Sequence, residues 1–527
     1  MRTTKVLGGR EGLFTPHPPG HPAMPRAEHP LHRLFYPRSV AIIGASRNPR
    51  KFGHIQVANL LRMGYEGRIY PINPRADEIS GLRCYPSVLE VPGEIDVAIV
   101  TIPAPKVPPV VEECAEKGVR FVVVISSGFR EAGPEGERLQ EAMLKAVEGT
   151  ETRIVGPNTT GILNPEARFT TTFMPIEGPV REGPVSFVVQ TGLFAGILLI
   201  HILTAEHFGI AKVAGLGNKC DLDEVEVLEY LGQDERTRVI AMYIEGVKNG
   251  RELMRVAKEV GLDKPIVVLK SGRTEAGTRA ALSHTGSVVG RDEVFDAACR
   301  QCGMIRARDF EELIDLAKAF AMQPPPRGPR LGVASYSGAG CVLASDECTL
   351  QGLELAELSP ESLARLEEAL PPWARAGHPI DLEPLHEGVG PDAYGLALEV
   401  LASDPGVDAI VVNIMALPEG LSGVPFYAGP DDLVRYFSAA REIAPDKPVA
   451  ICVGGDKGAV EAVVEALEGA GFPTYPSIRR AVRALSALSA YSAARERLAS
   501  SSWPLVRRPS QACSSNERDY LRSSRSR

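Results

Sequence analysis

The sequence predicts an α/β fold in which several parallel sheets follow one another along the chain. Short apolar runs alternate with amphipathic stretches over most of its length, as in sheets whose strands are joined by crossover helices. The 527 residues are enough for about three domains of ordinary size. A hydrophobic content of 44% and a charged content of 24% are typical of a soluble globular protein.

The first folded unit is expected over residues 34–160. Segment 55–63 has the helical period, and short apolar runs on either side of it predict strands. The predicted strands are 40–43, 68–72, 97–102, 119–125 and 152–155. Residues 1–33 are rich in Pro and His and lack an apolar period, so we expect a disordered extension there. Metal binding by its histidines is the alternative.

Two further units are expected over residues 161–322 and 331–490, and we interpret both as flavodoxin-like sheets. The strands expected in them are 183–189, 211–213, 239–244, 266–270, 331–335, 409–414 and 448–453. The Pro-rich segment 323–330 predicts a linker, and residues 491–527 predict a basic Ser/Arg-rich tail.

Composition excludes several classes of function. No run of 18 apolar residues exists and the N-terminus lacks an apolar signal core, so we expect a cytoplasmic protein without membrane contact. Nine cysteines without framework spacing favour reduced thiols, and Cys299-x-x-Cys302 alone predicts no metal site. A net charge of −8 argues against a nucleic-acid partner.

One histidine stands in a setting that favours chemistry. The run Ser283-His284-Thr285-Gly286-Ser287 follows a strand-like segment by about a dozen residues and precedes a helix-like one. Small hydroxyl-bearing neighbours leave the imidazole uncrowded and offer donors to an anion. Here the sequence resembles the NDP-forming acyl-CoA synthetases, relatives of succinyl-CoA synthetase. The resemblance implies that His284 carries a phosphoryl group between an acyl phosphate and a nucleotide.

A glycine turn directly follows the first predicted strand at Gly44. Such a turn, leading into a helix, presents backbone N–H groups to a phosphate. The G-x-G-x-x-G fingerprint is absent, which disfavours a nicotinamide cofactor. The cationic stretch Arg47-Asn48-Pro49-Arg50-Lys51 suits several phosphates, although a solvated basic loop remains the alternative.

The strand ends of this unit are expected to converge on one crevice. Their order resembles the Rossmann-like CoA-binding domain of the family, and the resemblance covers roughly residues 34–490. It implies a CoA site made of Gly44, Ser46, Arg47, Lys51, Arg75, Pro103, Ser126, Ser127 and Gly128.

The resemblance also implies an acyl and phosphate site. Gln190-Thr191-Gly192 would begin a helix whose free N–H groups point at the phosphohistidine, although an ordinary helix cap is the alternative. The residues implied for this site are Asn158, Gln190, Thr191, Gly192, Gly217 and Asn218. Thr159, Thr191 and His378 stand where the family usually has Cys, Ser and Asn.

Glu245 follows an apolar strand-like run. A carboxylate there can accept the N–H of the second ring nitrogen of a histidine, fixing its tautomer. Surface acids are plentiful, and it is the resemblance that implies this role with His284.

The reaction implied by the resemblance is acyl-CoA + phosphate + NDP ⇌ carboxylate + CoA + NTP. CoA and a small carboxylic acid would bind this chain, with no permanently bound cofactor. ATP/ADP with Mg would bind an ATP-grasp β-type partner subunit, because no such segment follows residue 490. A CoA-binding scaffold that has lost catalysis and the remnant of a protein acyltransferase are the alternatives.

Overall fold

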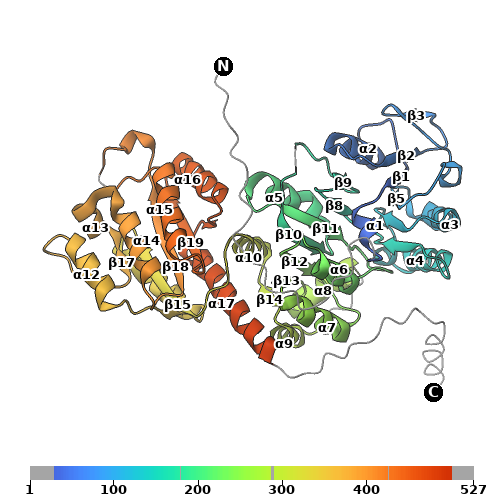
Figure 1. Cartoon of the computed structure of the whole chain (residues 1–527). Helices are drawn as coiled ribbons and strands as arrows, with labels where there is room; N and C mark the ends of the chain where they lie inside the picture. Colours follow the sequence, from blue (N-terminus) through green and yellow to red (C-terminus); the bar gives the residue numbers. More distant parts are fainter. Residues whose placement is uncertain (1–28, 179, 286–289, 425, 501–527) are drawn as a thin grey trace, which may run out of the picture.

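The protein consists of three α/β units, each built on its own sheet. A computed structural model describes residues 29–178, 180–285, 290–424 and 426–500. Figure 1 shows the first unit (blue) and the second (green) side by side, with the third (yellow to orange) on the other side of the long helix α17. The predicted α/β fold with parallel sheets is confirmed.

The first sheet is five-stranded and parallel, in the order β2-β1-β5-β6-β7. Its central strands are fully buried and apolar at every position except Ser39 in β1, as expected for a parallel sheet covered on both faces. The elements are β1 (Ser39–Ile43), α2 (Phe52–Met63), β2 (Arg68–Ile72), β5 (Val97–Val100), α3 (Val107–Lys117), β6 (Phe121–Val124), α4 (Pro134–Ala146) and β7 (Arg153–Val155).

The second sheet is seven-stranded, in the order β14-β13-β12-β10-β11-β8-β9. Its strands are β8 (Ile162–Asn164), β9 (Phe169–Thr170), β10 (Glu182–Val189), β11 (Ile210–Gly215), β12 (Val239–Ile244), β13 (Ile266–Lys270) and β14 (Ile305–Ala307). Its helices are α5 (Leu199–Ala205), α6 (Glu224–Gln233), α7 (Gly250–Gly261), α8 (Glu275–Thr285), α9 (Asp292–Cys302) and α10 (Phe310–Met322). The edge formed by β8 and β9 is antiparallel and was not predicted.

The third sheet repeats the parallel plan, in the order β16-β15-β18-β19-β20, and β17 also pairs with β15. Its strands are β15 (Arg330–Ser335), β16 (Glu354–Leu355), β17 (Ile380–Asp381), β18 (Ala409–Ala416), β19 (Val449–Gly455) and β20 (Thr474–Tyr475). Its helices are α11 (Gly338–Leu350), α12 (Pro360–Ala369), α13 (Leu382–Val389), α14 (Ala393–Ser403), α15 (Pro430–Ile443), α16 (Lys457–Gly469) and α17 (Ile478–Ser500).

Helix α17 joins the second and third units and corrects the predicted start of the tail. It packs against α10 on one side and against α11 and β19 on the other. The prediction that the basic Ser/Arg-rich tail begins at residue 491 is wrong, because α17 continues to Ser500. Tyr491 and Ala494 are buried on the same helix face, and the Tyr491 ring meets Phe320 of α10 edge-on.

Two other predicted limits shift. Leu31 is buried and the short helix α1 (His32–Phe35) begins at His32, so the folded part starts before residue 34. The predicted extension before residue 29 lies outside the described residues. Gln323 and Arg330 are not linker residues. The Gln323 side-chain oxygen accepts a hydrogen bond from Val449 N–H, and Arg330 is the first residue of β15.

In the part of the chain that the structure describes, no helix has the length and apolarity that crossing a bilayer requires.

Candidate active site

A cavity of about 470 Å³ lies at the carboxyl ends of the strands of the first sheet. This is the edge where open parallel sheets bind ligands. Of the residues predicted for CoA, Gly44, Arg75 and Pro103 line it. Asn73, Ser87, Lys106 and Glu113 also line it and were not predicted as site residues.

Gly44 allows the backbone to turn at the floor of this cavity. Its φ of +95° lies in the region that L side chains avoid. A Cβ on Gly53, at the start of α2, would lie 2.1 Å from the Gly44 carbonyl oxygen. Both positions therefore require glycine, and they let α2 begin directly against the turn. The Asn73 side chain fixes the same turn by donating to the Ala45 carbonyl at 2.8 Å.

The other residues predicted for CoA do not line the cavity but lie on neighbouring segments. Ser46 accepts from Asn48 N–H, Arg47 Nε donates to the Glu78 carbonyl at 3.0 Å, and Lys51 precedes α2. The Ser126 hydroxyl donates to the Ile102 carbonyl at 2.5 Å. The loop with Ser127 and Gly128 therefore lies beside the Ile102–Pro103 turn.

The predicted acyl and phosphate residues Asn158, Gly217 and Asn218 come together at the seam between the first two sheets. Asn158 N–H donates to the Ser126 carbonyl, and Asn218 N–H donates to the Pro157 carbonyl, each at 2.9 Å. A Cβ on Gly217 would lie 2.2 Å from the Pro157 oxygen, so the two loops touch backbone to backbone.

Gln190 and Glu245 meet at the carboxyl ends of β10 and β12. The Gln190 side-chain oxygen accepts from Glu245 N–H at 3.0 Å, and both residues are buried. The Thr191 hydroxyl accepts a hydrogen bond from Leu193 N–H at 3.2 Å, at the start of the helical segment that contains Gly192. This bond is the ordinary helix cap that the sequence offered as the alternative. The turn nevertheless lies next to Glu245.

His284 lies in the last turn of α8, whose first turn is held by Thr274 accepting from Gly277 N–H. The structure places the backbone of His284 but not its side chain. Gly286 and Ser287 lie outside the described residues. Helix α8 approaches the short 3-10 helix η4 (Arg130–Ala132) of the first unit within 8 Å between Cα atoms.

Lys219 connects the two parts of the site and had no sequence signal. Its Nζ donates to the Gly246 carbonyl at 2.6 Å and to Glu224 at 2.7 Å, while its φ of 50° is unusual for a side-chain-bearing residue. Asn218 beside it donates to Glu131 of the first unit. Hydrogen bonds thus run from the CoA-side loops to the turn that carries Glu245.

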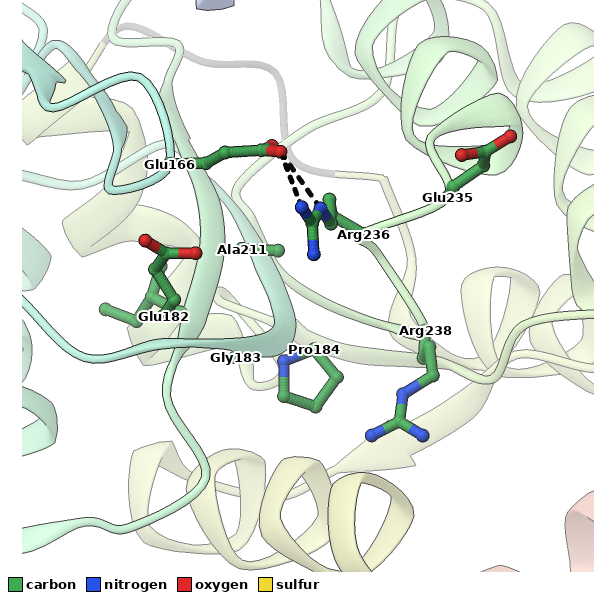
Figure 2. Close-up of a pocket in the computed structure, with 9 residues that line it drawn as sticks. Glu166, Glu182, Gly183, Pro184, Ala211, Glu235, Arg236 and Arg238 are labelled. Carbon is green, nitrogen blue, oxygen red and sulfur yellow. Dashed lines mark hydrogen bonds and ion pairs between the residues drawn. The ribbon is translucent and has the colours of Figure 1, made fainter. Parts of the chain in front are cut away.

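A second cavity, of about 320 Å³, lies at the amino-terminal ends of β10, β11 and β12 in the second sheet (Figure 2). Glu182 and Gly183 border it where β10 begins, and Arg238 just before β12. Figure 2 shows Glu166 pointing at Arg236, with which it forms an ion pair at 2.9 Å. None of the predicted site residues whose side chains the structure describes lines this cavity. The candidate site is therefore the one at the carboxyl ends of the strands.

Three family models match successive parts of the chain. Residues 38–165 match a CoA binding domain. Residues 182–320 match a succinyl-CoA ligase like flavodoxin domain, and residues 332–499 match a ligase-CoA domain. The matches follow the order of the three sheets.

Known proteins are similar to this chain in sequence over most of its length. The ADP-forming acetate–CoA ligase II of Archaeoglobus fulgidus is 43% identical over 88% of this chain and 67% of its own length. The subunit alpha of the ADP-forming acetate–CoA ligase I of Pyrococcus furiosus is 38% identical, over 86% of this chain and 96% of its own. The chain belongs to the ADP-forming acetate–CoA ligase family.

A solved structure also supports placing this chain in the ADP-forming acetate–CoA ligase family. The acetyl-coenzyme A synthetase 1 of Ca. Korarchaeum cryptofilum, described as dinucleotide forming and in complex with phosphate and ADP, superposes with a TM-score of 0.81 at 37% identity. It covers 89% of this chain and 98% of its own. These ligase relatives do not favour the scaffold and acyltransferase alternatives.

Proposed function

We propose that this chain is the α-type subunit of an ADP-forming acyl-CoA synthetase, an acid–thiol ligase. It interconverts acyl-CoA, phosphate and ADP with carboxylate, CoA and ATP. The observation that carries the proposal is the convergence of three features at the carboxyl edges of two adjacent sheets. These are the cavity beside Gly44 and Arg75, the loop of Asn218, and the Gln190–Glu245 turn.

The first sheet supplies the CoA site in this proposal. Arg75 and Lys106 bring positive charge to the cavity, which suits the phosphates of CoA. The turn at Gly44 brings the main chain close to the ligand, since no side chain stands there. The loop of Ser126 and Asn158 then leads from the cavity toward the second sheet.

The second sheet supplies the phosphoryl acceptor. Phosphate attacks the thioester carbonyl and CoA leaves as the thiol, giving an acyl phosphate. A ring nitrogen of His284 then attacks phosphorus, and the carboxylate leaves. Glu245 accepts the N–H of the other ring nitrogen, which keeps the attacking nitrogen deprotonated and nucleophilic.

The phosphohistidine passes its phosphoryl group to ADP, which together with Mg is held by an ATP-grasp β-type subunit. Support for a separate partner comes from the Pyrococcus furiosus relatives, whose names identify subunit alpha proteins and which match over 96% and 94% of their lengths. A covalent relay fits this division because the acyl site and the nucleotide site need not coincide.

Single-turnover phosphorolysis tests this function without the partner. The full chain is mixed with acetyl-CoA and phosphate, and free CoA thiol is followed with a colorimetric thiol reagent. We expect CoA release up to one equivalent per chain, and continued ATP synthesis once an ATP-grasp subunit and ADP are added. Sustained nucleotide-dependent turnover by the chain alone would contradict the division of labour. Absence of any thiol release would contradict the proposed function.

A further inference from the structure

Glu131 bonds both sides of the seam between the first two sheets. It lies in η4, directly after the Ser126–Gly128 loop. Its Oε1 accepts from Gly128 N–H at 2.7 Å and from Phe129 N–H at 3.1 Å. Its Oε2 accepts from the Asn218 side-chain amide at 2.5 Å. One carboxylate therefore ties the CoA-side loop to the acyl and phosphate loop.

The surroundings favour the ionised form of this carboxylate. Burial alone would raise the pKa of Glu131, but hydrogen bonds from Asn218, Phe129 and Gly128 lower its pKa below the usual value. Asn218 is only 5% exposed, and its amide also donates to Gln140 at 3.3 Å. Both amide hydrogens of Asn218 are thus directed at the first unit, which fixes the orientation of that side chain.

The same short helix also faces the element that carries the phosphoryl acceptor. Helix α8 approaches η4 within 8 Å between Cα atoms, and His284 lies in the last turn of α8. Lys219, the residue after Asn218, donates a hydrogen bond to the carbonyl of Gly246, which is next to Glu245 in the chain. Glu131 is consequently placed among all three parts of the proposed reaction.

We propose that Glu131 is a positioning residue of the ligase reaction, whose charged bond to Asn218 holds the acyl and phosphate loop in register with the CoA site. This inference rests on the proposed function and adds a residue to its machinery. Glu131 acts through Asn218 and contacts neither reactant. It determines whether the thioester carbonyl presented by the first unit lies where phosphate and His284 reach it.

The variant Glu131→Gln separates this role from a merely structural one. A glutamine oxygen still accepts from Gly128 and Phe129, so CoA affinity should stay within about threefold. Its amide, however, would oppose the Asn218 amide and remove the charge-assisted bond. The matched control is Glu135→Gln, because the exposed Glu135 pairs with Arg138 one turn along α4.

The experiment follows thiol release and histidine labelling from acetyl-CoA and radiolabelled phosphate on the full chain. We expect Glu131→Gln to react about tenfold or more slowly than wild type, with normal CoA binding by calorimetry. Asn218→Asp should be slower still, because two carboxylates would meet. Combining Glu131→Gln with Asn218→Asp restores an N–H to carboxylate bond with donor and acceptor exchanged, and should recover most of the rate.

Three results would overturn the inference: a wild-type rate in Glu131→Gln, an equal loss in Glu135→Gln, or a double variant no faster than the slower single one. If Glu131→Gln does not fold, Asn218→Ser tests the same bond while leaving the Glu131 contacts to Gly128 and Phe129 intact. Absence of label on the wild-type chain would count against the proposed function itself, and so the two failures are distinguishable.

Discussion

The side-chain oxygen of Gln190 accepts a hydrogen bond from the backbone N–H of Glu245 at 3.0 Å. This bond locks the end of β10 to the end of β12, so the turn that begins the helical segment after Thr191 and the carboxylate of Glu245 are held side by side. Because the Glu245 backbone supplies the bond, a change in its side chain leaves this lock intact.

Glu245→Gln therefore tests the carboxylate alone. We expect phosphorylation of the chain to slow about a hundredfold, because the histidine loses the acceptor that sets its tautomer and basicity. Melting temperature and CoA affinity should change little. The measurement is a phosphorylation time course with thermal unfolding in parallel, and Glu259→Gln on the exposed face of α7 is the control. A normal rate in stable Glu245→Gln protein would remove Glu245 from the mechanism.

Arg75→Ala tests the position of the CoA cavity. Removing this cation from the cavity lining should weaken CoA binding about tenfold, or about 1.4 kcal/mol, by calorimetry on the full chain. Arg138→Ala removes an exposed arginine from α4 and should leave the affinity unchanged. CoA binding no tighter than that of dephospho-CoA or AMP at matched salt would show that the site is wrongly placed.

Gly53→Ala tests the close approach of α2 to the Gly44 turn. The new Cβ would lie 2.1 Å from the Gly44 carbonyl oxygen, so the turn must move. We expect about 2 kcal/mol or more of lost stability by denaturant unfolding, together with weaker CoA binding. Gly250→Ala, at the start of α7 with nothing within 4 Å of its Cβ, should change stability by less than about 1 kcal/mol. Equal effects of the two changes would contradict the packing argument.

The sequence was sufficient to predict the central strands and part of the site, because both depend on local patterns. Apart from Ser39, the buried runs of β1, β5 and β6 are continuous and apolar, and the turn at Gly44 directly follows one of them. Gly44, Arg75 and Pro103 all lie at strand ends, where the topology of a parallel sheet brings them to one cavity.

The parts that were missed depend on contacts far apart in the chain. Lys106 and Glu113 line the cavity from segments without any local signal. Glu131 and Lys219 act through partners in other loops. The edge strands β8 and β9 have three and two residues, too short to show a period. Helix α17 passes residue 490 because its buried face meets the second unit, which the local pattern does not reveal.

A buried charge cluster between the second and third units gives a pH prediction. The Glu468 carboxylate of α16 forms hydrogen bonds with Lys318 of α10 at 2.9 Å, with His207 at 2.9 Å and with Thr474 at 2.6 Å. Lys318 also forms an ion pair with Glu206. Burial would raise the pKa of Glu468, but the bonds from His207, Lys318 and Thr474 lower that pKa to about 2. Burial raises the pKa of the neighbouring Glu206.

Because the folded pKa of Glu468 is depressed, its stabilisation is present above its usual pKa of 4.5 and is lost as pH falls toward about 2. The contribution of Glu206 to the free energy of unfolding changes with pH in the opposite direction. Because the folded pKa of Glu206 is raised, the folded state gains stability from this group as pH falls toward 4.5. The stability difference between wild type and Glu468→Gln reports the first effect together with the loss of the Glu468 charge that helps to raise the pKa of Glu206. Urea unfolding should show a large difference near pH 7 that shrinks by about pH 3. A difference independent of pH would contradict this assignment.

The chemical nature of the phosphorylated residue tests the phosphohistidine mechanism most directly. The full chain is incubated with acetyl-CoA and radiolabelled phosphate, or with labelled ATP and an ATP-grasp subunit, and the label is then exposed to acid and to base. We expect an acid-labile, base-stable label that maps to His284 and is absent from folded His284→Ala protein. Equal labelling of His284→Ala, or a label stable to acid, would contradict this mechanism.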